Sequence, residues 1–89
     1  MTVELFGMSR ALAGRAVVEL AVEGPVDYAG FVRALAEAVP ALVPDVIDRE
    51  RGSLVEPNLL LLDGRRAPRD GERFDAADRP CVLFLASGG

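Results

Sequence analysis

The sequence predicts an α+β roll, in which a mixed sheet of about four to five strands packs on one main helix. Three observations predict it: short strand-like segments at both ends of the chain, one amphipathic helical segment between them, and glycine or proline turns separating them. The chain has 89 residues, 51% hydrophobic and 27% charged, a balance typical of a folded domain. We expect one small domain over residues 1–85 and a flexible C-terminal tail over residues 86–89.

Two strands are expected near the N-terminus. Residues 2–6 alternate polar and apolar side chains, which is the period of a half-buried strand, and Gly7 ends this segment. The small and polar residues 8–14 predict a loop, and the β-branched residues 16–22 predict the second strand. Because only a short connection separates the two strands, we expect them to pair antiparallel.

The main helix is predicted to begin after Asp27, whose carboxylate can accept a hydrogen bond from the free backbone N–H groups of the first turn. Apolar residues then follow at helical spacing, and Pro40 ends the helix. These apolar residues are Phe31, Val32, Leu35, Ala36 and Val39. Residues 41–51 predict a short second helix that ends at Gly52, lined by Leu42, Val43, Val46 and Ile47.

Two further strand segments are predicted in the C-terminal half. Residues 54–62 form the third strand region, in which Pro57 marks an edge or a break because it has no N–H to donate. Asp63-Gly64 predicts a tight turn, and residues 81–85 predict the last strand. If this strand pairs beside the first, its end leaves the sheet at an edge. The predicted core consists of Val3, Leu5, Val18, Leu20, Phe31, Leu35, Leu60, Leu62, Phe74 and Leu83.

The composition excludes most self-contained catalysis. The chain has no His, no Lys and no Trp, and Cys81 is its single cysteine. A zinc site, a Ser-His-Asp or Cys-His arrangement and a Schiff-base lysine therefore cannot be assembled. Cys81 lies in an apolar run, which favours a buried, inert thiol. The sequence predicts a protein that is not an enzyme and that binds neither a metal nor a cofactor.

The charge composition disfavours a function in nucleic-acid binding. All ten basic residues are arginines, and the net charge of −4 disfavours binding to a phosphate backbone. A local basic cluster is interrupted by acidic residues and indicates a solvated loop; it comprises Arg65, Arg66, Arg69 and Arg73. No apolar run approaches the roughly 20 residues of a membrane helix, and no basic segment typical of a signal peptide follows Met1. We expect a cytoplasmic protein with neither nucleic acid nor membrane as a partner.

The C-terminal residues are open to two interpretations. The apolar residues 82–85 lead without a linker into Ser87, Gly88 and Gly89. A Gly-Gly tail has no Cβ atoms, so it can thread a narrow channel and deliver a carboxylate to the active site of another protein. The alternative is a frayed end or a truncated linker.

Three motifs, which together span nearly the whole chain, resemble the MoaD/ThiS family of ubiquitin-like sulfur carriers and most closely the small subunits of molybdopterin synthase. Residues 5–14 resemble the Leu-Phe-Gly-x-x-Arg-x-Leu-Ala-Gly opening of that family. Asp63-Gly64-Arg65 follows a leucine run where the family often has Asn-Gly-Arg, and residues 83–89 resemble its Gly-Gly end. Two segments depart: residues 77–81 lack the usual Asp-Gly-Asp-Glu-Val, and the tail lacks a proline pair.

The resemblance implies a β-grasp fold and a carrier function. An ATP-using, ubiquitin-activating-like enzyme would adenylate the Gly89 carboxylate, and sulfur would replace AMP to give a thiocarboxylate. A catalytic subunit such as the molybdopterin synthase large subunit would accept the sulfur, with Gly88 inside its channel. ATP belongs to the activating partner. The resemblance also implies contacts to the partners from Ser87 and Ala86 in the tail, from Phe6 and Phe84, and from Arg65 at the rim; the two phenylalanines are equally compatible with ordinary core positions.

Two alternatives to molybdopterin synthesis remain open. The atypical tail favours a carrier for another pathway, such as thiazole, cysteine, 2-thiosugar or tRNA thiolation. A different class is a ubiquitin-like modifier that forms isopeptide bonds with target lysines. Since the chain has no lysine, it cannot build lysine-linked chains on itself, which favours a carrier.

Overall fold

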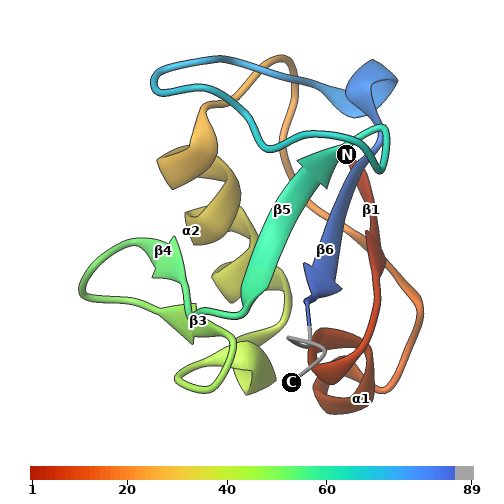
Figure 1. The fold of residues 1–89 in the computed structure, drawn as a ribbon, viewed down its shortest axis with the longest axis vertical. Coiled ribbons are helices and arrows are strands. Elements are labelled where there is room, and N and C mark those ends of the chain that lie inside the picture. Colours follow the sequence, from red (N-terminus) through yellow and green to blue (C-terminus); the bar gives the residue numbers. More distant parts are fainter. Residues whose placement is uncertain (86–89) are drawn as a thin grey trace.

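A four-stranded mixed sheet packs on helix α2 in the computed structural model, which describes residues 1–85 (Figure 1). The strand order is β2-β1-β6-β5. Strand β1 pairs antiparallel with β2 and parallel with β6, and β5 pairs antiparallel with β6. The strands are β1 (Thr2–Leu5), β2 (Val17–Glu19), β5 (Asn58–Leu62) and β6 (Pro80–Phe84), and the helix is α2 (Tyr28–Ala38). This arrangement confirms the predicted α+β roll.

Helix α2 forms as the sequence predicts. The Asp27 side chain caps it by accepting a hydrogen bond of 2.9 Å from the Gly30 N–H. The helix ends at Val39, and Pro40 begins the 3-10 turn η1 (Pro40–Leu42). Phe31, Val32, Leu35 and Ala36 form its buried face.

Nine of the ten predicted core side chains are buried, and the exception is Leu83. Val82 takes its place, because it pairs with Leu5 on β1 and Leu60 on β5, both of which face α2. Leu83 therefore points to the other side of the sheet. The prediction was wrong because the uninterrupted apolar run at residues 81–85 hides the alternation that would assign each side chain to a face.

Two segments between the main elements differ from the predictions. Residues 8–14 contain helix α1 (Met8–Ala13), which ends at Gly14 in the left-handed conformation. The predicted second helix over residues 41–51 is absent. Beyond η1 lies a small hairpin of β3 (Ile47–Asp48) and β4 (Ser53–Leu54). The Asp48 carboxylate organises its turn by accepting from the N–H groups of Glu50 and Arg51 at 3.1 Å each.

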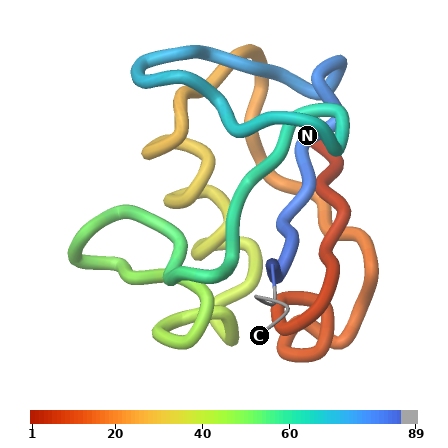
Figure 2. Tube along the Cα trace, in the orientation of Figure 1, coloured from red at the N-terminus to blue at the C-terminus, as the bar shows by residue number. Residues whose placement is uncertain are grey.

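The C-terminal half follows the predicted order. Pro57 breaks the third strand region between β4 and β5, and Asp63-Gly64 forms the tight turn with φ of 55° and 67°. Strand β6 lies between β1 and β5 and is therefore an inner strand. The chain thus leaves the sheet at the end of an inner strand and not at an edge strand. There the Leu85 N–H donates to the Pro57 carbonyl at 3.1 Å, and the start of α1 lies beside the end of β6 (Figure 2). The predicted tail lies outside the described residues.

Candidate functional site

Exposed apolar side chains gather where the chain leaves β6. Phe6 follows β1, Met8 and Leu12 lie on α1, and Leu85 follows β6; between 38% and 58% of each residue is exposed. Met8 and Leu12 are four positions apart, so they share one face of α1. The described part of the chain has five exposed large apolar residues, and the fifth, Val17, lies on β2 and outside this group.

Phe6 is not a core residue. Its N–H donates to the Val82 carbonyl at 2.9 Å, which continues the β1–β6 pairing by one residue. Since Leu5 faces the core, Phe6 faces the opposite side of the sheet. The exposed position excludes the core interpretation for this side chain.

Three leucines extend this apolar surface across β5 and β6. Leu59 pairs with Leu83, and Leu61 lies two residues further along the same face of β5. All three are half-buried, whereas Leu60, Leu62 and Val82, which face α2, are buried. We call the surface formed by Phe6, Leu59, Leu61, Leu83 and Leu85 the outer sheet face.

Phe84 does not belong to the outer sheet face. It alternates with Leu83 and lies on the same side as the buried Val82, so its half-buried side chain faces the core side at the end of β6. A Cβ built on Gly7 would lie only 2.6 Å from the Phe84 Cβ, so these two residues are in close contact.

Arg65 lies far from this surface. It follows the turn at the end of β5 where Leu62 pairs with Pro80, whereas Asn58 at the other end of β5 pairs with Phe84. The step from Pro80 to Phe84 corresponds to about 13 Å along the strand. The structure therefore does not bring Arg65 together with Phe6 and Phe84. The remaining candidates, Ala86, Ser87, Gly88 and Gly89, lie outside the described residues.

Met8, Leu12 and Leu85 are exposed apolar residues on the segments around the chain exit, and the sequence did not identify them as site residues. The small and polar composition of residues 8–14 predicts a loop, and no Ser, Thr, Asp or Asn before them signals a helix cap. The N-cap is instead Gly7, without a side-chain hydrogen bond. The four-residue spacing of Met8 and Leu12 was the available signal.

Two of the four arginine side chains in the basic cluster of residues 65–73 make structural contacts, and these are Arg66 and Arg73. Arg66 holds Glu72 through two hydrogen bonds of 2.7 and 2.8 Å, and the Arg69 N–H also donates to this carboxylate. These contacts lower the pKa of Glu72 to about 2. Arg73 donates to the Pro25 carbonyl at 2.9 Å. This part of the chain therefore acts as a structured, charged loop.

Cys81 is buried, as predicted. Only 7% of the residue is exposed. Burial raises the pKa of its thiol, and the charge of Glu4 raises it further. A thiol in this setting is a poor nucleophile at neutral pH.

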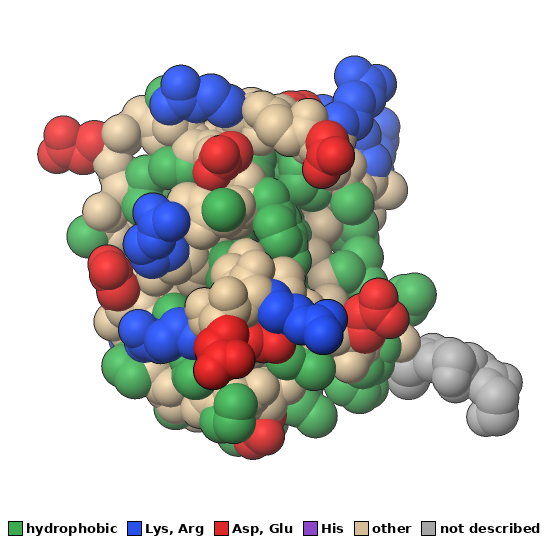
Figure 3. All heavy atoms as spheres, turned by 90° about the vertical axis from the view of Figure 1, so that its left-hand side faces the viewer, with side chains coloured by type: hydrophobic (Ala, Val, Ile, Leu, Met, Phe, Trp, Pro, Cys, Tyr) green, Lys and Arg blue, Asp and Glu red, His purple; other side chains and the backbone are tan. Residues whose placement is uncertain are grey.

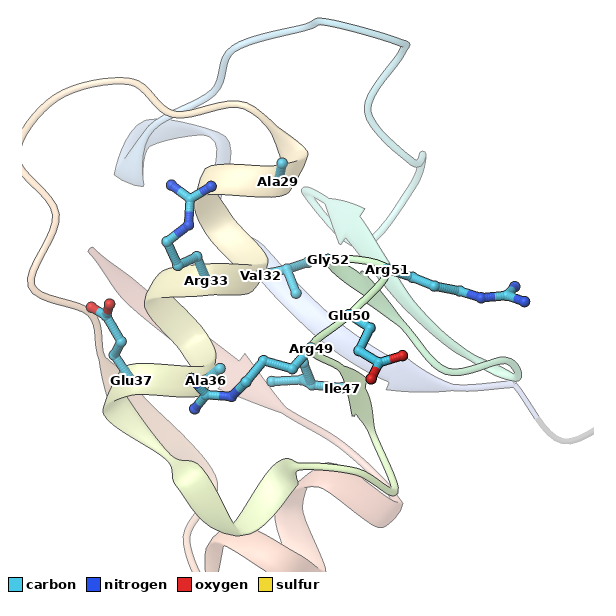
Figure 4. Close-up of a pocket in the computed structure, with 10 residues that line it drawn as sticks. All are labelled: Ala29, Val32, Arg33, Ala36, Glu37, Ile47, Arg49, Glu50, Arg51 and Gly52. Carbon is cyan, nitrogen blue, oxygen red and sulfur yellow. The ribbon is translucent and has the colours of Figure 1, made fainter.

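A concave region lies between α2 and the β3–β4 hairpin, with a volume of about 520 Å³ (Figure 4). Val32, Ala36 and Ile47 form its apolar floor, while the charged ends of Arg33 and Arg51 point away from each other. Basic and acidic side chains are interspersed over this face of the molecule (Figure 3). The charged groups do not converge on a common point, so this hollow lacks the geometry of a catalytic site.

The described residues contain no group of three or more His, Cys, Asp or Glu side chains placed to hold a metal ion. Over residues 1–85, no helix has both the length and the apolar character needed to cross a membrane.

Two solved structures resemble the chain over its whole length. The crystal structure of SAMP1 from Haloferax volcanii is 30% identical with a TM-score of 0.78, and the match covers 100% of this chain and 98% of that one. The chain belongs to the small archaeal modifier protein family. A crystal structure of H. volcanii small archaeal modifier protein 1 matches at 28% identity and a TM-score of 0.76, over 97% of both chains. The likeness confirms the ubiquitin-like β-grasp fold. No protein-family model and no curated protein matches the sequence.

Proposed function

We propose that the chain is a ubiquitin-like sulfur carrier whose Gly89 carboxyl group is activated by a partner enzyme and converted to a thiocarboxylate. The observation that carries the proposal is the gathering of exposed apolar side chains around the end of β6. Exposed apolar patches of this kind are typical of protein interfaces. A partner that covers the outer sheet face and α1 is placed to receive the residues that follow Leu85.

The chemistry needs only a carboxylate from the carrier. In the proposed first step, the Gly89 carboxylate attacks the α-phosphorus of ATP held by the partner, which forms an acyl adenylate and releases pyrophosphate. Sulfur at the oxidation level of sulfide then attacks the carbonyl carbon, AMP leaves, and Gly89 carries a thiocarboxylate. The partner supplies ATP and any acid or base, which agrees with a carrier that has no His and no Lys.

The contacts with the partner divide into two groups. Phe6, Leu83 and Leu85 would form the apolar centre of the interface, because aromatic and apolar side chains contribute most where water is excluded. Ala86 and Ser87 would contact the entrance of the partner's channel, and Gly88 would lie inside it. Phe84 acts indirectly in this proposal, because it supports the end of β6 from the core side.

Molybdopterin synthesis is our first proposal for the destination of the sulfur. It is supported by the resemblance of residues 5–14 to the opening motif of the molybdopterin synthase small subunits. The catalytic partner would then be the large subunit of that enzyme. The absence of a proline pair in the tail supports the other sulfur pathways, among them thiazole, cysteine, 2-thiosugar and tRNA thiolation.

A protein modifier is the second candidate, and the observation that favours it is the name of the relatives, small archaeal modifier protein 1. The first step would be the same adenylation of Gly89. The amine of a lysine in a target protein, instead of sulfur, would then attack the carbonyl carbon of the adenylate, AMP would leave, and an isopeptide bond would form.

Pyrophosphate exchange with the adenylating enzyme of the same genome tests the shared first step. The 89-residue protein should support exchange of pyrophosphate into ATP, whereas a variant lacking Gly89 and a variant with one alanine after Gly89 should not. Full exchange with the extended variant would overturn the proposal. Adding sulfide in one arm and a lysine-containing protein in the other distinguishes the carrier from the modifier.

A further inference from the structure

We infer that Gly7 fixes the direction in which the chain leaves β6 and is thereby a positioning residue for activation of the C-terminus. Its role in activation rests on the proposed function.

Phe84 occupies the space next to the Gly7 Cα in which a side chain would begin. A Cβ on Gly7 would lie 2.6 Å from the Phe84 Cβ and 3.7 Å from the Phe84 Cα. Real Cβ atoms do not approach another carbon as closely as 2.6 Å, so the end of β6 occupies space that only glycine leaves free. Any side chain at this position would push the last residue of β6 aside.

The backbone around Gly7 has little freedom to yield to such a push. Gly7 itself has φ 67° and ψ −132°, a conformation that favours glycine. On one side, the Ser9 hydroxyl, which is fully buried, donates to the Phe6 carbonyl at 3.1 Å. On the other side, the Ala11 N–H donates to the Gly7 carbonyl at 3.1 Å. The adjustment to a side chain would therefore fall on Phe84.

The opposite side of the exit is held by Pro57. The Leu85 N–H donates to the Pro57 carbonyl at 3.1 Å, and this bond continues the β5–β6 pairing beyond the last strand residue. Phe84 and Leu85 thus lie between Gly7 on one side and Pro57 on the other. Contacts from β1, α1 and the start of β5 together determine the direction of the chain at Leu85.

The proposed interface holds the outer sheet face against the partner, so the chain must leave Leu85 at a defined place and in a defined direction to reach the partner's active site. A side chain at position 7 that displaces Phe84 changes both the place and the direction. A misplacement of about 1 Å can lower a reaction rate about 100-fold. Gly7 therefore has an effect on activation that its contribution to stability does not measure.

The test compares Gly7→Ala with Gly14→Ala. Gly14 ends the same helix at φ 74°, but a Cβ there would meet nothing within 4 Å. Both variants place alanine at a positive φ, and only Gly7→Ala introduces an atom against Phe84. A chemically synthesised protein with D-alanine at position 7 is the second control, because a D-residue adopts a positive φ readily and directs its methyl group away from the position of an L-Cβ.

Two readouts are measured at a temperature where circular dichroism shows the variants folded. The first is hydrogen exchange of the Leu85 amide, and the second is kcat and KM for pyrophosphate exchange with the adenylating enzyme. Gly7→Ala should lower the protection of the Leu85 amide and kcat by about tenfold or more each, with KM little changed. Gly14→Ala and the D-alanine protein should match the wild type in both readouts.

Equal kcat values for Gly7→Ala and Gly14→Ala, or unchanged protection of Leu85 in Gly7→Ala, would overturn the inference. If Gly7→Ala does not fold, Phe84→Gly is used instead, because it removes the contact from the side of β6. This variant should also lower the protection of the Leu85 amide and kcat. Wild-type values for both would overturn the inference. A wild type that supports no pyrophosphate exchange contradicts the proposed function, while the Leu85 amide still tests the geometry.

Discussion

The rings of Phe31 and Phe74 meet in the core with their centroids 5.7 Å apart and their planes inclined by 54°. Phe31 lies on α2, whereas Phe74 lies in the long connection between β5 and β6. Phe74 also exchanges two backbone hydrogen bonds of 2.9 Å with Val26, just before the helix. Through these contacts, one aromatic residue attaches a segment with little regular structure to the main helix.

Phe74→Ala should therefore destabilise the fold strongly. Removing a buried phenylalanine side chain costs about 3–5 kcal/mol, and Leu35→Ala on the buried face of α2 should cost about 2–5 kcal/mol. Urea denaturation followed by circular dichroism measures both. Leu12→Ala is the matched control, because Leu12 is exposed on α1 and its truncation should change the free energy of unfolding by only about 0.5 kcal/mol. Equal losses for Leu35→Ala and Leu12→Ala would show that the core is assigned incorrectly.

Glu72 should contribute a pH-dependent stabilisation. Its pKa is about 2 in the folded chain, against an ordinary value of 4.5, because Arg66 and the Arg69 N–H favour the charged form. A lowered pKa stabilises the fold above pH 4.5, and this contribution is lost as the pH falls through the folded-state value of about 2. The melting temperature of Glu72→Gln should therefore lie below that of the wild type at pH 7, and the difference should shrink between pH 4.5 and pH 2. A difference that is constant over this range would contradict the assigned ion pair.

Cys81 should react with thiol reagents only when the fold opens. The residue is buried and the pKa of its thiol is raised, so little thiolate is accessible at neutral pH. Alkylation by iodoacetamide, followed by mass spectrometry, should be at least about tenfold slower in the folded protein than in urea. Equal rates in the two conditions would show that the β6 thiol is exposed.

Phe6 and Arg65 provide a matched test of the proposed interface. Phe6→Ala should weaken binding to the adenylating enzyme by more than about 1 kcal/mol, because it removes an exposed aromatic side chain beside the exit of the chain. Arg65→Ala should have a smaller effect, since Arg65 lies at the other end of β5. Calorimetric titration of each variant measures the difference. A larger loss for Arg65→Ala would show that the interface lies at the opposite end of the sheet.

The elements that could be predicted from the sequence are those with a local signal. Asp27 is a strong helix cap, the apolar residues of α2 have helical spacing, and the alternation in residues 2–6 assigns each side chain of β1 to a face. The turn at Asp63-Gly64 was predictable because both residues adopt a positive φ, which this pair tolerates well.

The elements that could not be predicted depend on contacts distant in the sequence. Helix α1 has no side-chain cap and is held by the buried Ser9 and by Gly7 against β6. The segment after Pro40 contains buried apolar residues at a spacing that fits a helix, but Val46 instead accepts a backbone hydrogen bond from Val55 at 2.8 Å. The candidate site was predictable in part: Phe6 could be named from its motif, whereas the opposite orientations of Leu83 and Phe84 required the register of β6 with β5.

Intact-mass analysis detects a thiocarboxylate at Gly89. The 89-residue protein would be incubated with its adenylating enzyme, ATP and sulfide, and its mass then measured without reducing or alkylating reagents. The mass should rise by the difference between one sulfur and one oxygen atom. The change should map to the C-terminal peptide containing Gly89 and should be absent when ATP is omitted. An unchanged mass under conditions in which ATP is cleaved to AMP and pyrophosphate would contradict the carrier function.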